Sequence, residues 1–286
     1  MRVAVTGAAG FVGRATVEHL RAHGHIVDPL TRAEWDIAKG TYATTADAVV
    51  HCAALADDWA PLGTAMLANR VGTRNVVASF PDARIVHVST ASVYDAFTPN
   101  VSVAESEAPV TRFLSSYAES KTAAELELPA DAVVLRPHAV YGPGDTTLLP
   151  RILAGIRGHR LALPNGARVS HTLTHIDNLV AAIALSLDGP AGVYNIGDDT
   201  DVLLSAVLTE FLARRGRKDA RITSIPYGVA FAAAGALEKL SFGRRPRITR
   251  YAVSQLGLER TLDLAAAREK LGYVPGPTTL AGAEGW

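Results

Sequence analysis

Tyr117 and Lys121 are the residues whose types and spacing are best suited to chemistry. They lie four apart in the stretch "SSYAESK" at 115 to 121. On a helix, side chains four apart lie on the same face, so the phenol and the ammonium can act on one small volume. A phenol titrates near ~10, and a nearby cation would make it a usable proton donor or acceptor by stabilising its anion. By itself the spacing is weak evidence, because an exposed Tyr and an exposed Lys recur at this spacing by chance.

A glycine-rich segment near the N-terminus supplies a candidate cofactor site. In "VAVTGAAGFVG", Gly7, Gly10 and Gly13 follow a strand and open a helix, with Phe11 and Val12 between them. Glycines at such positions permit a tight turn and let the backbone approach a pyrophosphate, while the N–H groups of the helix N-terminus face the anion. Because strand, loop and helix come in the required order, the segment predicts a dinucleotide-binding loop.

Short β-branched runs alternate with helical stretches through the first half of the chain. The predicted strands are "RVAVTG", "HIVDPL", "AVVHCAA", "RIVHVST" and "DAVVLRP". Strands separated by crossover helices form a parallel sheet covered on both faces, and right-handed crossovers make it doubly wound. We therefore expect an α/β fold with a doubly wound parallel sheet of the Rossmann type and a small C-terminal substrate lobe. Residues 1–165 are assigned to the dinucleotide-binding domain and 166–286 mostly to the lobe, with a strand near 192–197 rejoining the main sheet.

The composition excludes some classes of partner. Lys plus Arg equals Asp plus Glu at 28 each, so no net basic charge favours nucleic acid, and the expected partner is a small molecule. The single cysteine, Cys52, rules out an internal disulfide and fits a reducing compartment.

The N-terminal pattern shows no secretory signal, so we expect a cytoplasmic protein. The nine histidines are scattered without ligand spacing, so no metal site is expected. The apolar stretch at 227–240 is too short to span a bilayer and predicts a packed helix, which could form a substrate wall or lie on a membrane surface.

Together, the "TGxxGxxG" loop and the "YxxxK" pair resemble the extended branch of the short-chain dehydrogenase/reductase superfamily. Nearly the whole chain takes part, and the other matching segments are "HCAALA" (51–56), "NRVGTRNVV" (69–77), "VSTASVY" (88–94) and "LRPHAVYGPGD" (135–145). The resemblance implies that Tyr117 exchanges a proton with the substrate carbonyl or alcohol. It implies that Lys121 stabilises the tyrosine anion and bonds the nicotinamide ribose. Aligning the serine-rich motif on Val93 and Tyr94 makes Thr90 the hydroxyl that holds the substrate oxygen, in place of the commoner serine.

The same resemblance assigns the cofactor contacts. The family's acidic position for the ribose hydroxyls falls at Thr31, followed by Arg32, which would attract a 2′-phosphate. NADP is therefore the expected cofactor, and NAD is expected instead if Asp28, further back in the strand, takes the ribose. Asn69 matches a position that fixes the active-site helix and the cofactor. His138 is expected to be a pocket-lining or satisfied histidine, because the tyrosine already fills the acid/base role. The remaining cofactor candidates are Asp36 and Ile37 beside the adenine, Ala53 and Ala54 after the third strand, and Pro137 and Val140 beside the nicotinamide.

Several reaction types share this core and its hydride transfer. A dehydratase needs an added acid/base pair after the hydroxyl donor, and Ala91 stands there, so dehydration is disfavoured. The Arg that pairs with a sugar-nucleotide diphosphate would fall near His171, although Arg168 could substitute. We expect an NADP-dependent oxidoreductase that interconverts a carbonyl and a secondary alcohol on a small, apolar substrate, as in the hydroxysteroid-dehydrogenase-like branch. The alternatives are a nucleotide-sugar epimerase or 4-ketoreductase, and a non-enzymatic NADP-binding regulator. The resemblance also suggests a homodimer.

Overall fold

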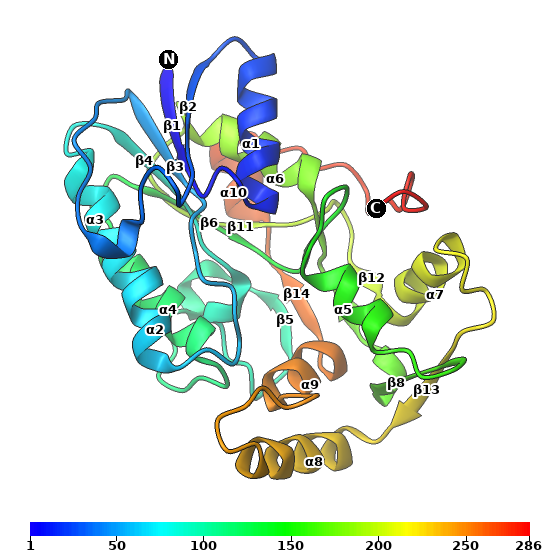
Figure 1. Ribbon diagram of the computed structural model, residues 1–286. Helices are drawn as coiled ribbons and strands as arrows, with labels where there is room; N and C mark the ends of the chain where they lie inside the picture. The colour runs from blue at the N-terminus through cyan, green and yellow to red at the C-terminus, as the bar shows by residue number, and fades with distance from the viewer.

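A six-stranded parallel sheet forms the centre of the molecule in the computed structural model, which describes residues 1–286 (Figure 1). The strand order is β11-β6-β4-β3-β1-β2, and every neighbouring pair is parallel. The chain runs from β1 to β2 on one side and to β3, β4, β6 and β11 on the other, so the winding reverses beside β1. The predicted doubly wound α/β class is confirmed. The strands are β1 (Arg2–Thr6), β2 (Ile26–Leu30), β3 (Ala48–His51), β4 (Arg84–Val88), β6 (Val133–Pro137) and β11 (Gly192–Ile196).

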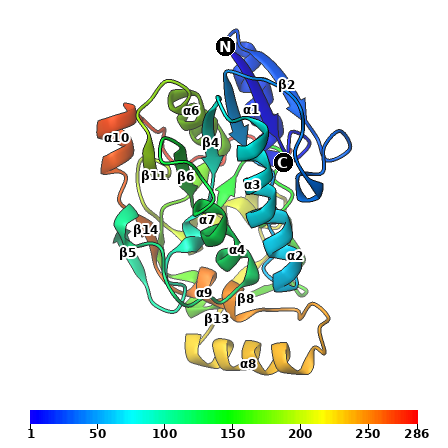
Figure 2. The same ribbon diagram turned by 90° about the vertical axis from the view of Figure 1, so that its left-hand side faces the viewer.

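Helices cover both faces of this sheet (Figures 1 and 2). Because such strands are buried on both sides, alternate residues of one strand enter different cores. In β1, Val3 and Val5 pack in the same cluster as Leu20, whereas Ala4 packs in a second cluster with Phe80. Each fully buried aliphatic or aromatic side chain of this kind stabilises the fold by ~1.5–3 kcal/mol. One layer holds α1 (Phe11–Ala22), α6 (Ile176–Ser186) and α10 (Ala265–Leu271); the other holds α2 (Leu62–Met66), η2 (Leu67–Val71), α3 (Gly72–Ser79) and α4 (Ser116–Glu125).

A smaller lobe lies at the carboxyl ends of the strands. Its core includes Ile152, Leu161 and Leu208, and its strands β8 and β13 pair in parallel. The two parts interleave along the chain more than a division at residue 165 implies. Helix α5 and strand β8 precede that residue and belong to the lobe, whereas α6 and α10 follow it and pack on the main sheet. Strand β11 joins the main sheet, as expected for the strand near 192–197. The lobe elements are α5 (Leu148–Ala154), β8 (Arg160–Pro164), α7 (Leu204–Arg214), β13 (Arg221–Ile225), α8 (Tyr227–Leu240) and α9 (Arg250–Gly257).

Short elements connect the lobe to the main sheet. Four of the strands form a sheet of order β12-β9-β14-β5, and β10 pairs with β7. These strands are β5 (Asn100–Val103), β7 (Val140–Tyr141), β9 (Ser170–His171), β10 (Thr174–His175), β12 (Val202–Leu203) and β14 (Arg260–Leu262). The remaining single-turn helices are η1 (Ile37–Lys39), η3 (Ala91–Val93), η4 (Glu105–Glu107) and η5 (Asn165–Ala167).

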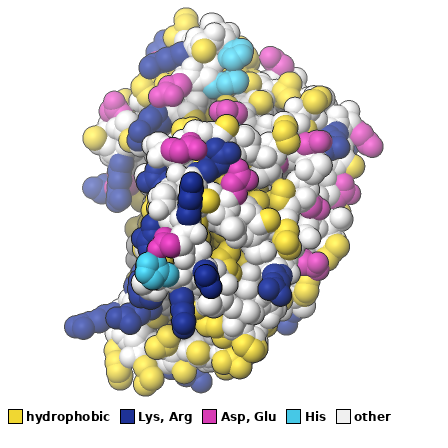
Figure 3. Space-filling view, turned by 90° about the vertical axis from the view of Figure 1, so that its right-hand side faces the viewer, with side chains coloured by type: hydrophobic (Ala, Val, Ile, Leu, Met, Phe, Trp, Pro, Cys, Tyr) yellow, Lys and Arg dark blue, Asp and Glu magenta, His cyan; other side chains and the backbone are white.

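Helix α8 lies at one extreme of the molecule, away from the central sheet (Figures 1 and 2). Figure 3 shows hydrophobic side chains gathered at this lower end, whereas charged side chains of both signs are spread over the rest of the visible face. None of the helices is both long and apolar enough to pass through a bilayer.

Candidate active site

The glycine loop between β1 and α1 has the shape of a phosphate cradle. Gly7 has a φ of +68°, and a Cβ added there would lie 2.7 Å from backbone atoms of Ala53 on the neighbouring β3 loop. A Cβ on Gly13 would overlap the Gly7 carbonyl oxygen. Both positions therefore require glycine, because a side chain at Gly7 would force the β1 and β3 loops apart and one at Gly13 would push α1 away from the glycine loop.

The first turn of α1 leaves donors free for an anion. Its N-cap, Gly10, supplies no side-chain hydrogen bond, and the turn contains no acidic residue. The amide N–H groups of Phe11, Val12 and Gly13 have no acceptor within the protein. Unpaired amides at a helix N-terminus attract a phosphate through both hydrogen bonds and the helix dipole. The loop thus fits the pyrophosphate of a dinucleotide.

Buried polar side chains fix the floor beneath this loop. His51 on β3 lies opposite Thr6 on β1, and its Nδ1 lies 2.7 Å from the Thr6 hydroxyl oxygen. Its Nε2 lies 3.0 Å from the hydroxyl oxygen of Thr73, which donates to the backbone oxygen of Asn69. Burial lowers the pKa of His51 to about 3, so the ring is neutral and links the two hydroxyls. The Ala53 N–H donates to the same Thr6 hydroxyl at 3.3 Å, which joins the β3 loop to the glycine loop.

Asn69 connects the cofactor loop to helix α4. Its side chain is 1% exposed; Oδ1 accepts from the Leu55 N–H at 2.7 Å, and Nδ2 donates to the Leu55 oxygen at 3.2 Å. The same Nδ2 donates to the Ser120 hydroxyl at 2.8 Å, which in turn donates to the Tyr117 carbonyl. Asn69 therefore holds α4, which carries Tyr117 and Lys121, against the loop that follows β3. Ala54 lies in that loop, between Ala53 and Leu55.

Lys121 is not a surface lysine. Only 2% of the residue is exposed, and its ammonium donates to the Val88 carbonyl at 2.9 Å and lies 2.8 Å from His87 Nε2. Burial lowers its pKa to about 8 and holds the pKa of His87 well below its usual range, so the lysine donates to a neutral imidazole. The other ring nitrogen, His87 Nδ1, is buried and has no partner. The arrangement points a cation at the carboxyl end of β4.

Tyr117 and Thr90 belong to a chain of hydroxyl groups at that same end of β4. Tyr117 lies in the first turn of α4, whose N-cap Ser115 accepts from the Ala118 N–H. Burial raises the pKa of Tyr117, and a hydrogen bond with the Thr90 hydroxyl opposes this rise. Thr90 also donates to the Ser92 hydroxyl at 3.0 Å. The structure therefore brings the three predicted catalytic residues Thr90, Tyr117 and Lys121 to one place.

Tyr251 extends this chain from the lobe and was missed in the sequence analysis. Its hydroxyl shares a 2.6 Å hydrogen bond with Ser92, and burial raises its pKa well above the usual range. Tyr251 lies in α9, 159 residues from Ser92 along the chain. No local pattern in the sequence marks this tyrosine, because its position depends on how the lobe packs.

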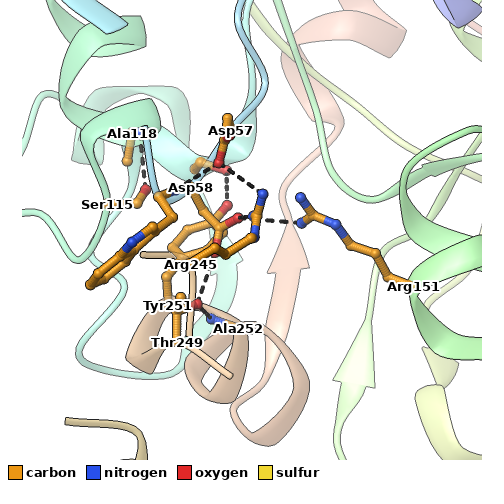
Figure 4. A network of polar contacts seen from close by, with 11 residues as sticks. Asp57, Asp58, Ser115, Ala118, Arg151, Arg245, Thr249, Tyr251 and Ala252 are labelled. Carbon is orange, nitrogen blue, oxygen red and sulfur yellow. Dashed lines mark hydrogen bonds and ion pairs between the residues drawn. The ribbon is translucent and has the colours of Figure 1, made fainter. Parts of the chain in front are cut away.

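A buried aspartate fixes the helix that carries Tyr251 (Figure 4). Asp58, in the loop after β3, accepts from the Thr249 hydroxyl at 2.8 Å, and Thr249 caps α9 by accepting from the Ala252 N–H. Asp58 Oδ1 also pairs with Arg245, and Arg151 Nη1 lies 3.4 Å from the same oxygen. Figure 4 shows the two guanidinium groups approaching the carboxylate from the lobe. These contacts fasten the lobe to the main domain beside the predicted catalytic hydroxyls.

The predicted adenosine end carries more negative charge than expected. Arg32 is 87% exposed and lies 3.4 Å from Asp36, which caps η1 by accepting from the Ala38 N–H. Glu34, which the sequence analysis did not consider, accepts from the Thr31 N–H at 2.6 Å. Ile37 packs on Gly72, where an added Cβ would lie 2.7 Å from its Cδ1 atom.

Asp28 is occupied elsewhere. Its carboxylate accepts from Arg2 Nε at 2.6 Å, two residues before the end of β2. The pair lies away from the carboxyl ends of the strands, where ligands bind in this kind of sheet. This position favours Thr31 and Arg32 over Asp28 as the residues beside the ribose.

The segment after β6 places Pro137 at the end of that strand and Val140 in β7. His138, between them, is buried, and its Nε2 lies 3.2 Å from His171 Nδ1. Burial lowers the pKa of both rings, so both histidines are neutral.

Burial raises the pKa of Cys52, in the loop after β3, to about 12, which keeps that thiol protonated. No group of three or more His, Cys, Asp or Glu side chains is arranged to hold a metal ion.

A cavity of about 920 Å³ lies beside the N-terminus of α4. Ser115 and Ser116, directly before Tyr117, line one side, and residues 58–61 of the β3 loop line another. Arg168 does not line this cavity. The apolar part of the wall is formed by Trp59, Ala60, Leu114, Phe231, Ala232 and Ala236, three of them from α8. The charged lining residues are Asp58, Glu238, Lys239 and Arg250.

Comparison with known proteins shows the family. Residues 3–197 match the sequence model of the NAD dependent epimerase/dehydratase family. The chain is 34% identical to a 4-hydroxy-2-methyl-3-oxo-4-farnesyl-3,4-dihydroquinoline-1-oxide ketoreductase of Stigmatella aurantiaca, over 96% of this chain and 92% of that protein. It is 30% identical to a 2-alkyl-3-oxoalkanoate reductase of Shewanella oneidensis, over 94% of this chain and 81% of that protein.

Solved structures share the fold. The crystal structure of dTDP-4-dehydrorhamnose reductase from Bacillus anthracis, in complex with NADP, superposes with a TM-score of 0.72 and 18% identity, covering 99% of this chain and 96% of that chain. The family is defined by its nicotinamide dinucleotide, and the glycine loop described above fits such a cofactor. The chain belongs to the NAD dependent epimerase/dehydratase family, and it is an NAD(P)-dependent oxidoreductase of the extended short-chain dehydrogenase/reductase type.

Proposed function

We propose that this enzyme reduces a ketone on a small, apolar substrate to a secondary alcohol with NADPH. The observation that carries the proposal is the buried cation, Lys121, beside the Tyr117 and Thr90 hydroxyls, next to Ser115 and Ser116 on the wall of a partly apolar cavity. Burying an ammonium is costly, so a lysine held by two hydrogen bonds at the end of a strand favours a functional role.

The proposed roles follow from the contacts. Thr90 and Tyr117 would donate hydrogen bonds to the substrate oxygen, and Tyr117 would give up its proton as negative charge develops there. The nicotinamide, when bound, supplies the hydride to the carbonyl carbon. Lys121 would stabilise the tyrosine anion that remains until a proton from solvent restores the phenol. His87 and the Val88 carbonyl keep the ammonium in place by accepting two of its three N–H bonds.

The substrate class is proposed from the cavity wall and from the two relatives. Apolar side chains of α8 and of the β3 loop would bury an alkyl chain, while the hydroxyls at the end of β4 orient the carbonyl. Both relatives are named as reductases of ketones on molecules that carry an alkyl or farnesyl chain. A sugar nucleotide would need cations for its diphosphate. Arg168 is outside the cavity, and of the two cations that line it, Arg250 is paired with Glu238 and only Lys239 is unpaired.

The test is a substrate panel with NADPH. We expect turnover of alkyl ketones and 3-oxoalkanoates that increases with chain length, and no binding of uridine or thymidine diphosphate by calorimetry. Tight binding of either nucleotide, with turnover of a 4-keto sugar nucleotide, would establish the epimerase or 4-ketoreductase alternative. Binding of NADPH without turnover of any carbonyl compound would identify a non-enzymatic regulator.

Arg32→Ala is expected to weaken NADPH binding about 10- to 150-fold, because one charge-assisted hydrogen bond to the 2′-phosphate is worth about 1.5–3 kcal/mol. NADH binding should change little, since NADH lacks that phosphate. Fluorescence titration of both cofactors measures the two affinities.

Glu34→Gln provides the matched control at the same end of β2. Removing this carboxylate should strengthen NADPH binding, because it eliminates a repulsion next to Thr31. If Glu34→Gln instead weakens NADH binding and Arg32→Ala changes neither affinity, Glu34 holds the ribose hydroxyls and the enzyme uses NAD.

Two further properties are part of the proposal. We propose a homodimer, on the grounds of the family resemblance, and a cytoplasmic location, because the single cysteine, Cys52, fits a reducing compartment. The residues that would contact the cofactor remain those predicted from the sequence, together with the free amides at the start of α1.

A further inference from the structure

Helix α8 has an apolar side with nothing packed on it. Only Ala230 and Ala234 of this helix are fully buried, in a small cluster with Val253 of α9. A different side lines the cavity through residues 231, 232, 235, 236, 238 and 239. On the remaining side, Val229, Leu237 and Leu240 are exposed.

These exposed residues form one stripe that continues past the end of the helix. Val229, Ala233, Leu237 and Leu240 are spaced four, four and three apart, which places them on one face. Phe242, two residues beyond Leu240, is 91% exposed and lies at the end of the stripe. Exposed apolar side chains that occur singly need no explanation, but a continuous stripe marks a surface that something covers.

Unpaired cations lie next to the stripe. The segment 226–250 contains five Lys and Arg residues and one acid, although the whole chain is neutral. Arg245 pairs with Asp57 and Asp58, and Arg250 pairs with Glu238. The other three cations, Lys239, Arg244 and Arg247, are exposed and have no acidic partner.

We propose that the stripe and these three cations dock the protein on the surface of a membrane that contains anionic lipids. An apolar helix face with an aromatic residue at its end can enter the headgroup region while flanking Lys and Arg side chains bind lipid phosphates. A second copy of the chain fits this face poorly, because a two-fold contact would bring the same three cations against themselves. The helix lies at the extreme of the molecule, so it can reach a flat surface without obstruction (Figures 1 and 3).

Docking in this way would also place the cavity near the bilayer, because α8 separates the stripe from the cavity wall. This consequence rests on the proposed function, whereas the docking itself does not. A vesicle-binding measurement therefore tests the docking without any turnover.

The experiment is co-sedimentation of the full chain with large vesicles of phosphatidylcholine alone or of phosphatidylcholine mixed with phosphatidylglycerol. We expect binding to the mixed vesicles, little binding to phosphatidylcholine alone, and release at high salt, because lipid charges are screened there. The double variant Leu240→Ser/Phe242→Ser should bind at least about tenfold more weakly, since it removes two apolar side chains from the interface. The double variant Arg244→Glu/Arg247→Glu should lose binding to the mixed vesicles.

Matched controls come from α10 and the segment after it. Val274 is 89% exposed and Lys270 is exposed without an acidic partner, so Val274→Ser and Lys270→Glu make the same kinds of change on a different surface. Both controls should bind vesicles like the parent protein. Equal binding by all four variants, or no binding by the parent, would overturn the proposal. So would a concentration-dependent dimer in sedimentation velocity that Leu240→Ser/Phe242→Ser abolishes, because a second copy would then cover the stripe.

Discussion

Tyr117→Phe is expected to lower kcat about 10²- to 10⁴-fold while NADPH affinity stays within about twofold of the parent, because general acid catalysis contributes a factor of this size and the phenol oxygen is the proposed acid. The ring itself stays, so the wall of the site keeps its shape. Stopped-flow turnover and fluorescence titration of NADPH measure the two effects separately.

Stability provides a further check on this variant. The phenol hydroxyl of Tyr117 lies in a partly buried site beside the Thr90 hydroxyl, and its loss should change the free energy of unfolding by about 1 kcal/mol. Tyr42→Phe is the matched control, since the Tyr42 phenol makes no hydrogen bond and packs beside Trp35. A control with parent activity and a Tyr117→Phe enzyme with parent activity would together contradict the acid role. A parallel loss of NADPH binding would show that the phenol acts in binding instead.

The core of the site could be predicted from sequence because its parts are local. The glycine loop needs Gly7 and Gly13 within one turn, and Tyr117 and Lys121 are one helical turn apart, so short spacing alone brings them together. Thr90 was assigned from the resemblance of "VSTASVY" to the family's serine-rich motif, and it lies at the end of a strand, where a parallel sheet opens onto the ligand side. Such features do not depend on how distant segments pack.

Other parts of the site depend on distant segments. Asp58 meets Arg245 and Thr249 across 187 and 191 residues, and nothing in the sequence near Asp58 indicates which residues it will meet. Tyr251 reaches Ser92 only because that network fixes α9. These contacts were therefore not predictable from periodicity or motif spacing.

The predicted division at residue 165 does not fully separate the dinucleotide-binding domain from the lobe, for a related reason. An amphipathic helix has the same pattern whether it packs on the main sheet or in the lobe, so α6 and α10 gave no signal of their place on the sheet. Glu34 was overlooked because a carboxylate four residues after a strand is common on surfaces, and only its bond to the Thr31 N–H distinguishes it.

Lys121→Met is expected to lower kcat about 100-fold or more, because the tyrosine anion loses the cation that stabilises it. For the parent enzyme, reduction should weaken as the pH rises through about 8, where the buried ammonium loses its proton. The variant should lack this decline. Lys270→Met, which removes an exposed lysine on α10, should leave both the rate and its pH profile unchanged.

As the pH rises through about 8, the stability of the parent enzyme should increase while its turnover falls. This contrast separates a catalytic role of Lys121 from a structural one. A folded pKa of about 8, lowered from 10.5, means that the charged lysine costs the folded state about 3 kcal/mol near neutral pH. Replacing it removes that cost but leaves His87 Nε2 and the Val88 carbonyl without a donor, which costs about 1–3 kcal/mol. The two effects nearly cancel, so urea unfolding near neutral pH should give similar stabilities for parent and variant.

Above about pH 8 the unfolded chain binds the proton more tightly than the folded one, so the free energy of unfolding of the parent should rise by about 2–3 kcal/mol relative to that of the variant by about pH 10. A variant that is much less stable at every pH, with turnover falling only in proportion to the folded fraction, would show that Lys121 has no catalytic role.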